Sequence, residues 1–509
     1  MQNPLIFFAE NIHANIVYLA VPLILLTVVI SAVFLDKRSI PVIVVALFAG
    51  LIFGGDGLRL WDFNNMDLAN QLANLALVFI LFHGGFCTKK EELKLVALPA
   101  IGLASWGVIL TAVFTFVCLH FILGWDKNLA ILPSVIISST DAAAIFSILR
   151  KQPLGHKLRS TIEIESAAND PMAILLTVVA VQALSTGEAL SLYVFVSDFL
   201  WKFLAAPIFG FVIAKAVAWL INKLTPQENG YYYIIQLCTA MFTYGFAETF
   251  HASGMLAVFT AGIVLGNMQF VHKQGVYNFS SAVSTIFNIL LFVLLGVLVE
   301  PHNWFKENLF LKGILLFIFL SFVARPAAVF VGTIGMHIKF KDRLFIAWSG
   351  LRGAVPITLA TYPAAAGMEE GIEIFSLVFF AVLLSLLFQG SSLGKVAKLL
   401  RLSMPFRSEP PYSLEFFTKN TMEAGQAITV FTVDLPDPEG REGPVIKDLK
   451  LPDNTLLLMI ARRQKTPSDI WNVLSPRGDT VLRGWDQITI LSKVEDEEKV
   501  RDMLQKAFS

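Results

Sequence analysis

The segment Glu165-Ser166-Ala167-Ala168-Asn169-Asp170 places two carboxylates inside a stretch that otherwise reads as a membrane-spanning helix. The chain continues with Pro171-Met172-Ala173-Ile174-Leu175-Leu176-Thr177-Val178-Val179, so Asp170 is flanked by apolar sequence rather than by a loop. An ionised carboxylate near the bilayer centre costs about 2.5–3.5 kcal/mol on insertion scales, and it needs a partner, a water-filled cavity or a transported ion. The segment therefore predicts an ion or proton site in a membrane transporter.

The composition places the chain among polytopic membrane proteins. Of its 509 residues, 55% are hydrophobic and 15% are charged, and the mean hydropathy is +0.66. The formal net charge is zero, so nothing indicates nucleic acid as a partner. The three cysteines are dispersed and show neither metal nor disulfide spacing: Cys87, Cys118 and Cys238.

Apolar stretches separated by short polar breaks predict thirteen transmembrane helices. They lie at about 16–35, 41–54, 68–86, 95–123, 129–150, 161–185, 193–222, 231–250, 255–271, 281–299, 309–337, 344–362 and 372–399. Fourteen lysines and arginines fall in one set of alternate loops, whereas the opposite loops hold Arg59, Lys127 and Lys306. Because basic loops stay in the cytoplasm, we expect the N-terminus outside and the C-terminus inside.

The composition changes after Arg401, which divides the chain into a transmembrane domain, residues 1–404, and a cytoplasmic domain, residues 405–509. In the second part, residues 455–461 and 487–491 have the apolar character of strands, and residues 494–508 have a helical period with dense charge. These features predict a small α/β or β-rich domain behind an all-α membrane domain.

Polar residues interrupt two more of the predicted spans. The fifth contains Ser138-Ser139-Thr140-Asp141, whose side chains compete for backbone hydrogen bonds and so weaken a helix. The twelfth contains Gly350-Leu351-Arg352-Gly353-Ala354-Val355-Pro356, with two glycines and a proline. A broken helix in each half of the chain is typical of a midplane ion site between inverted repeats.

The sixth span carries polar groups on two helical faces. Glu163 and Asp170, seven residues apart, share one face, whereas Glu165 and Asn169 share another. Both faces cannot meet lipid, so this helix is expected at the centre of the bundle. Asp170 is the predicted exchange site, because desolvation favours the protonated carboxyl and a monovalent cation can replace that proton. Competition for one carboxylate couples two ions in opposite directions.

Two arginines are candidates to compensate the buried carboxylates. Arg325 lies within the eleventh span and Arg352 within the twelfth. Each could neutralise opposed helix ends or pair with a carboxylate. Snorkelling of Arg325 to the inner surface is the alternative, but Arg325 is distant in sequence from the basic cluster at 339–343.

These motifs resemble the monovalent cation:proton antiporter family over residues from about 10 to 400. The motifs are Thr140-Asp141, Glu165-Ser166-x-x-Asn169-Asp170 and Gly350-Leu351-Arg352-Gly353-Ala354, in the family's order. Within the family, the first two motifs and their neighbours are similar to the bacterial potassium/proton branch linked to cell-volume regulation. Many relatives have proline after the first aspartate, where this chain has Ala142.

The resemblance implies thirteen spans with two inverted repeats, two broken crossing helices, a dimerisation domain and a mobile core. It implies that a monovalent cation binds at Asp170, Asp141 and Thr140, with Ser139 and Asn169 beside them. The structural or ion-paired set is Glu163, Glu165, Arg325 and Arg352: Glu165 would pair with Arg325, and Arg352 would balance the crossing. Asparagine before the aspartate is typical of electroneutral exchange in this family.

Residues 440–492 are similar to the regulatory module of potassium transport proteins, the RCK-C or TrkA-C type, at Pro476-x-Gly478-Asp479-Thr480 and Gly484-Trp485-Asp486. This implies regulation by a ligand, such as a nucleotide or cyclic dinucleotide, or by cytoplasmic ionic conditions. A passive module that stabilises a dimer is the alternative. A Rossmann-type site is not expected, since the chain has no Gly-x-Gly-x-x-Gly phosphate loop. No cofactor is expected, and the partners are K⁺ or Na⁺, H⁺, the bacterial inner membrane and a second copy in a homodimer.

Three alternatives stay open at this point. A potassium channel would need a Thr-Val-Gly-Tyr-Gly-like filter, and the nearest string, Thr243-Tyr244-Gly245-Phe246, lacks that spacing. A membrane-embedded enzyme would need a nucleophile or metal ligands near Asp170, and the eight histidines show no paired spacing. The third alternative is that sodium, not potassium, is the main substrate. The choice of ion depends on cavity size and ligand number, which the sequence does not supply, and the resemblance to the potassium branch favours potassium.

Overall fold

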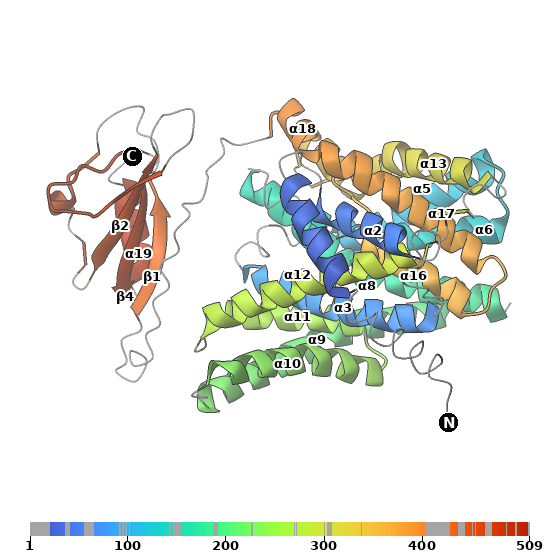
Figure 1. Cartoon of the computed structure of the whole chain (residues 1–509), viewed down its shortest axis with the longest axis horizontal. Helices are drawn as coiled ribbons and strands as arrows, with labels where there is room; N and C mark the ends of the chain where they lie inside the picture. The colour runs from blue at the N-terminus through green and yellow to red at the C-terminus, as the bar shows by residue number, and fades with distance from the viewer. Residues whose placement is uncertain are drawn as a thin grey trace, which may run out of the picture. The chain divides into compact units, whose positions relative to one another are not determined.

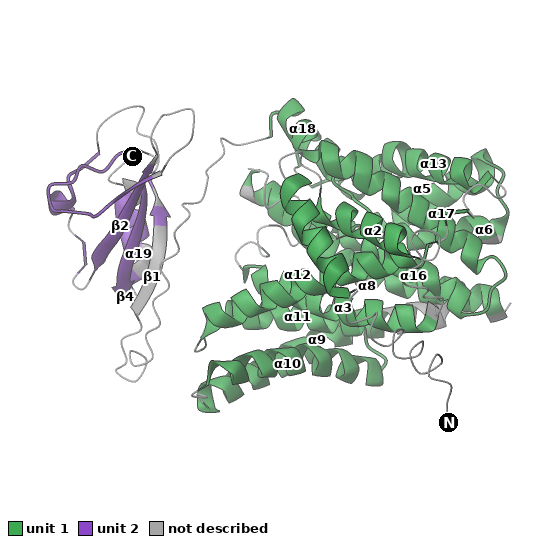
Figure 2. Ribbon diagram, in the orientation of Figure 1, with its two compact units in different colours: residues 1–406 green, residues 407–509 purple. Residues whose placement is uncertain are grey.

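The computed structural model of the chain divides into two compact units, residues 1–406 and 407–509 (Figure 2). The residues that the structure describes are 21–35, 41–54, 66–90, 93, 96, 99–100, 102–141, 144–145, 154–186, 192–224, 228–268, 270, 272–299, 301–302, 308–336, 338–402, 428–435, 443–449, 451–452, 455–463, 471–484, 486–493 and 496–506. The domain boundary predicted at residue 404 lies outside them, as do Ala142 and Trp485.

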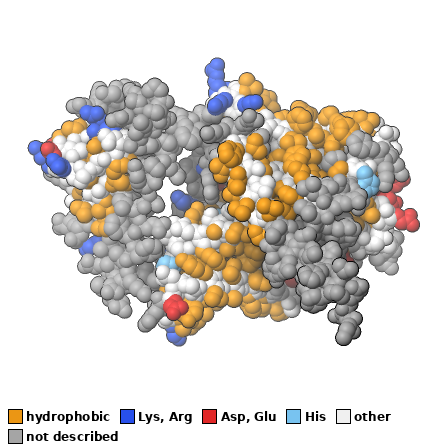
Figure 3. Space-filling model, in the orientation of Figure 1, with side chains coloured by type: hydrophobic (Ala, Val, Ile, Leu, Met, Phe, Trp, Pro, Cys, Tyr) orange, Lys and Arg blue, Asp and Glu red, His pale blue; other side chains and the backbone are white. Residues whose placement is uncertain are grey.

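Unit 1 is a helical membrane protein (Figure 1). In its described part, seven helical segments are long and apolar enough to cross a membrane: Asp67–Cys87, Leu103–Ile122, Lys157–Ser185, Leu200–Leu224, Lys273–Val297, Leu309–Gly332 and Gly371–Leu399. Shorter apolar helices are Val21–Leu35, Val42–Phe53 and Gly254–Asn267. Figure 3 shows hydrophobic side chains gathered over the visible face of these helices, as lipid contact requires.

Six helices of unit 1 pack against one another and are called the α3 group. They are α2 (Val42–Phe53), α3 (Met66–Cys87), α9 (Leu192–Leu224), α10 (Asn229–Thr249), α11 (Gly254–Asn267) and α12 (Lys273–Val297). Glycines let their backbones approach closely, because an added Cβ at Gly85, Gly262 or Gly296 would collide with the backbone of a neighbouring helix. These glycines therefore hold α3 close to α11, and α12 close to α2.

A second set of described helices in unit 1 packs together and is called the α8 group. They are η1 (Leu103–Gly107), α5 (Val108–Val117), η2 (Cys118–Ile122), α6 (Lys127–Ile136), α8 (His156–Thr186), α13 (Leu309–Phe319), η4 (Leu320–Ala324), α14 (Arg325–Gly332), α15 (Phe340–Trp348), α16 (Ala354–Ala365), α17 (Gly371–Leu384), η5 (Ser385–Gly390) and α18 (Ser391–Leu399). The two groups meet where α16 packs against α3 and α12, and where α8 packs against α3 and α11.

Both predicted helix interruptions are present. The fifth span is helical in α6, leaves the helix before residues 140–141, and is helical again at residues 144–145. The twelfth span ends its first helix, α15, at Trp348 and begins α16 at Ala354. Each interruption frees backbone N–H and C=O groups within the membrane, where they need partners from the protein.

Unit 2 is a small antiparallel sheet with a helix. The strand order is β1 (Ile428–Asp434), β4 (Gln487–Lys493), β2 (Leu456–Arg463), β3 (Trp471–Leu474). Ile428 pairs with Lys493, Leu456 with Leu491 and Ile460 with Leu474, and a bulge lies between Leu457 and Met459. Helix α19 (Glu497–Lys506) buries Val500 and Leu504 in a core with sheet residues such as Ile460, Ile488 and Ile490. The unit thus has a hydrophobic core of its own.

Candidate cation and proton site

The two interrupted helices cross at Asp141. Its backbone N–H donates to the carbonyl oxygen of Leu351 over 2.8 Å, and its carboxylate oxygen Oδ2 accepts from the N–H of Ala354 over 3.1 Å. Ala354 is the first residue of α16, so the carboxylate lies at the positive N-terminal end of that helix. At Gly353 an added Cβ would collide with the same carboxylate, which explains why the residue before the helix is glycine.

Arg352 makes the reciprocal contact. Its Nη1 donates to the backbone oxygens of Ser138, over 2.9 Å, and of Ser139. These carbonyl groups follow the end of α6, where no further helical turn supplies N–H groups to donate to them. Each broken span therefore supplies the charge that the exposed helix end of the other span requires, a carboxylate in one case and a guanidinium in the other.

Glu165 and Arg325 form a fully buried ion pair. Arg325 Nη2 lies 2.9 Å from Glu165 Oε1 and 3.0 Å from Oε2, and each side chain is 1% exposed. Arg325 starts α14 directly after the π-helical turn η4 and is followed by Pro326, which has no N–H for the regular ladder. The guanidinium also packs against Gly350, where an added Cβ would collide with it.

Asn169 links this ion pair to the fifth span. Its Nδ2 donates to Thr140 Oγ1 over 2.6 Å and to Glu165 Oε1 over 3.2 Å. Because an ionised carboxylate only accepts, the amide end that faces Glu165 must be the NH₂ group. Thr140 in turn shares a hydrogen bond of 2.8 Å with Ser166. Both donors of Asn169 are thus used, and its carbonyl oxygen is oriented away from them.

Asp170 follows directly and is also buried, at 1% exposed. In the part of the chain that the structure describes, its oxygen Oδ1 has no hydrogen-bond partner. The same holds for three more buried oxygens on segments that pack together, which are Asn169 Oδ1, Ser139 Oγ and Thr358 Oγ1. A buried oxygen without a donor is costly, and a carboxylate most of all. These atoms have the chemistry of a site for a small cation or a proton.

The buried charges do not balance. Among the described residues of unit 1, the charged side chains that are fully buried are Asp141, Glu165, Asp170, Arg325 and Arg352. Three carboxylates against two guanidinium groups leave one negative charge when all are ionised. Asp141 is held at a helix end and Glu165 by an arginine, so the surplus falls on Asp170. One proton or one monovalent cation there makes the cluster neutral.

The predicted residues divide into two sets. The contacts above join Ser139, Thr140, Asp141, Glu165, Asn169, Arg325 and Arg352. Asp170 is buried directly after Asn169 on α8. Glu163 stands apart, because its carboxylate accepts from Arg159 over 2.8 Å and both side chains are partly exposed. Its ion pair is local, one helical turn along α8.

Four buried polar residues near the site were not predicted as site residues: Ser166, Thr358, Ser385 and Gln389. Ser166 bonds Thr140, Thr358 Oγ1 is one of the oxygens without a partner, and Ser385 accepts from the N–H of Arg352 and donates to Gln389. All are buried in apolar helices. Ser385 and Gln389 are four residues apart, so they share a helical face in an apolar span. The rule that intramembrane polar groups need a partner could have found them.

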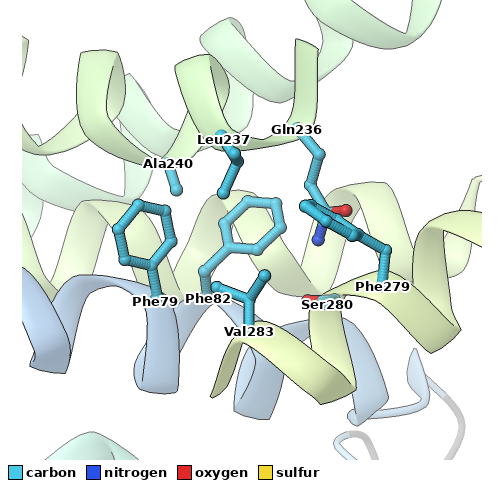
Figure 4. Close-up of a pocket in the computed structure, with 8 residues that line it drawn as sticks. All are labelled: Phe79, Phe82, Gln236, Leu237, Ala240, Phe279, Ser280 and Val283. Carbon is cyan, nitrogen blue, oxygen red and sulfur yellow. The ribbon is translucent and has the colours of Figure 1, made fainter. Parts of the chain in front are cut away.

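A small pocket lies elsewhere, within the α3 group. It is lined by Phe79, Phe82, Gln236, Leu237, Ala240, Phe279, Ser280 and Val283 from α3, α10 and α12 (Figure 4). Its walls are aromatic and aliphatic apart from Gln236 and Ser280. None of the predicted site residues lines it, so the buried charge cluster, and not this pocket, is the candidate functional site.

The transmembrane sodium/hydrogen exchanger family matches residues 23–399 of the chain. The chain belongs to this family. The match covers the α3 group and the α8 group and contains every residue of the buried charge cluster. Members of the family are transporters, which removes the membrane-embedded enzyme and the channel as interpretations of the exchanger domain.

Individual relatives agree with this assignment. The exchanger is 31% identical over 500 residues to the K(+)/H(+) antiporter NhaP of Alkalimonas amylolytica, covering 97% of this chain and 84% of that protein. It is 26% identical over 374 residues to the Na(+)/H(+) antiporter 1 of Methanocaldococcus jannaschii, covering 70% and 83%. The solved structure of the sodium proton antiporter MjNhaP1 from M. jannaschii superposes with a TM-score of 0.65 at 24% identity, covering 76% of this chain and 99% of that one. The fold is therefore that of MjNhaP1.

Proposed function

We propose that this exchanger moves one monovalent cation, preferably K⁺, against one H⁺ across the bacterial inner membrane, with Asp170 as the shared binding group. The buried charge cluster carries the proposal. Its three carboxylates and two arginines leave one negative charge, and the Asp170 oxygen Oδ1 has no donor among the described residues. A proton or a monovalent cation satisfies both requirements, and the two cannot be bound at once.

One surplus charge also sets the stoichiometry. With either ion bound, the cluster is neutral and can be carried through the low-dielectric membrane, whereas the empty cluster keeps a buried charge and is disfavoured. The exchanger therefore changes its access only when loaded. One cation for one proton transfers no net charge, so the exchange is electroneutral.

The packing supports alternating access by one helix group against the other. Helices of the α3 group are joined by glycine contacts between backbones. The charge cluster lies in the α8 group, on α8, on α14, in the interruption after α6 and in the segment before α16. Because α8 and α16 are the helices that meet the α3 group, a shift of the α8 group moves the site relative to a fixed wall.

Potassium is favoured because a relative that is 31% identical over 97% of this chain is named a K(+)/H(+) antiporter. The second candidate is Na⁺ (or Li⁺)/H⁺ exchange at the same site. It is favoured by the match to the Na(+)/H(+) antiporter 1, which covers 70% of this chain. The two candidates share the residues and the coupling and differ only in the size of the cation that the oxygens accept.

The wider organisation that we propose has thirteen spans in inverted repeats, the N-terminus outside, and unit 2 in the cytoplasm. Unit 2 acts as an RCK-C-like regulatory domain with a nucleotide or cyclic dinucleotide as effector, and two copies of the chain form a homodimer. Support comes from the basic residues in alternate loops and from the separate core of unit 2. The physiological role is in cation, pH and cell-volume homeostasis.

Proton flux in liposomes tests the proposal. Purified full-length protein is reconstituted with an internal pH dye, and K⁺, Na⁺ or Li⁺ is added with the membrane potential clamped and unclamped. We expect alkalinisation driven by K⁺ and indifferent to potential, and its loss in Asp170→Asn. Asp67→Asn, an exposed carboxylate on α3, is the matched control and should exchange normally. Cation-driven flux that persists in Asp170→Asn would reject the site.

A further inference from the structure

The interruption between α15 and α16 leaves backbone groups that the fifth span does not satisfy. Asp141 accepts from the N–H of Ala354 and donates to the carbonyl of Leu351. The carbonyl of Trp348, at the end of α15, and the N–H of Arg352, between Leu351 and Ala354, need other partners. Both find them on the last apolar span, Gly371–Leu399.

Two side chains of the π-helical turn η5 supply these partners. The Arg352 N–H donates to Ser385 Oγ over 3.1 Å, and the Ser385 hydroxyl donates to Gln389 Oε1 over 2.6 Å. Gln389 Nε2 then donates to the carbonyl oxygen of Trp348 over 3.4 Å. The donor and acceptor roles in this chain of bonds are compatible. The Ser385 oxygen accepts from the backbone N–H, and its hydroxyl hydrogen donates to the amide oxygen of Gln389. The two side chains therefore bond a backbone group at the end of α15 and another in the segment before α16.

Two further hydrogen bonds extend the network to Ser392. The Trp348 indole N–H donates to Ser392 Oγ over 3.0 Å, and the Ser392 hydroxyl donates to the carbonyl of Gln389 over 3.1 Å. Ser385 is 0% and Gln389 1% exposed, although Phe388 in the same turn is exposed on the surface. A buried amide in an apolar span is costly unless every polar atom is bonded, and π-helical turns concentrate at functional positions.

We propose that Ser385 and Gln389 are positioning residues of the exchange site: they hold the Arg352 segment and, through it, set the geometry in which Ser139, Thr140 and Asp141 meet the cation. The inference rests on the proposed function, because the cation and the proton define the site. Only Arg352 lies between Ser385 and the fifth span. Its backbone N–H donates to Ser385, and its guanidinium donates to the carbonyls of Ser138 and Ser139.

A purely structural role for the pair predicts a different result. If Ser385 and Gln389 served folding alone, their loss would lower the amount of folded protein and the maximal rate together. A positioning role changes the site itself, so the apparent KM for the cation and the ratio of the KM values for K⁺ and Na⁺ must change.

The test compares full-length Ser385→Ala and Gln389→Met with the wild type in liposomes, titrating K⁺ and Na⁺ at a fixed pH. We expect the apparent KM for the preferred cation to rise about fivefold or more, with a changed K⁺/Na⁺ ratio and a maximal rate per folded protein within about twofold. Ser385→Ala removes a single oxygen atom and decides the question if Gln389→Met does not reach the membrane. The double variant should add little to the larger single effect, because both act through one segment.

Two controls match the variants. Ser391→Ala removes an exposed hydroxyl that bonds only its own helix, and Thr243→Val removes a buried hydroxyl that bonds Thr239 O within α10. Both should keep the wild-type KM values. Unchanged KM values and an unchanged ion ratio in Ser385→Ala would overturn the positioning role. Asp170→Asn in the same preparation tests the proposed function separately, since exchange retained there would reject the function whatever Ser385→Ala shows.

Discussion

The carboxylate of Asp141 accepts a hydrogen bond from the backbone N–H of Ala354 over 3.1 Å, 213 residues further along the chain. This contact joins the break in the fifth span to the break in the twelfth. It means that Asp141, predicted as a ligand of the cation, also caps the helix α16, and that Gly353 beside it has no room for a side chain. The geometry of the site therefore depends on small residues as much as on charged ones.

Gly353→Ala should abolish or strongly reduce exchange. The added Cβ collides with the Asp141 carboxylate, so the crossing must open or Asp141 must leave the end of α16. The loss of the cap alone costs about 1 kcal/mol. Exchange per folded protein in liposomes measures the effect. Gly245→Ala is the control, because nothing lies within 4 Å of its Cβ, and it should keep activity and gain about 1 kcal/mol of helix stability. Normal exchange by Gly353→Ala would show that the crossing tolerates the displacement.

Arg325→Ala should lower the stability of the protein more than the double variant Arg325→Ala/Glu165→Gln. Removing one partner of a buried pair leaves the other charge without compensation and costs about 3–5 kcal/mol. Removing both charges keeps the net buried charge of the cluster unchanged. Thermal unfolding in detergent, followed by size-exclusion chromatography, reports the order. A single variant as stable as the wild type would contradict the energetic role of the 2.9 Å pair.

The apparent KM for the cation should rise as the pH falls, by up to about tenfold per pH unit in the acidic range, with the maximal rate unchanged. The sign follows from competition. A proton on Asp170 occupies the oxygens that the cation needs, so acid favours the protonated site and alkali the cation. Titrating the cation in liposomes at symmetric pH values from 6 to 9 measures this dependence. A maximal rate that falls in acid at constant KM would instead indicate a separate titrating group that turns the exchanger off.

Deletion of residues 405–509 should preserve the exchange reaction and change its regulation. Units 1 and 2 have separate hydrophobic cores, so we expect unit 1 to keep its core without unit 2. We expect the truncated protein to couple the same ions with the same KM for the cation. Its response to cytoplasmic pH, ionic strength or nucleotides should be altered. Complete loss of transport in a stable, membrane-inserted truncation would make unit 2 part of the transport machinery.

Local sequence determined the class of protein and most of the candidate site. Apolar windows mark helices that cross a membrane, and a charge inside such a window is conspicuous because the membrane makes it costly. This reasoning singled out Asp141, Glu165, Asp170, Arg325 and Arg352, which are the charged side chains that the described part of unit 1 buries. Runs of glycine, serine and proline likewise marked both helix interruptions. The family resemblance supplied the pairing of Glu165 with Arg325.

Only the tertiary structure decided which polar group meets which. Arg352 bonds Ser138, 214 residues away, and its N–H bonds Ser385 on another span. Only the structure also explains Gly350 and Gly353. The absence of a side chain at these positions makes room for Arg325 and Asp141. The physical reason is that the cost of a polar group in the membrane is local and can be read from its neighbours in sequence. Its compensation depends on the distance and direction of atoms on distant helices, which only their packing sets.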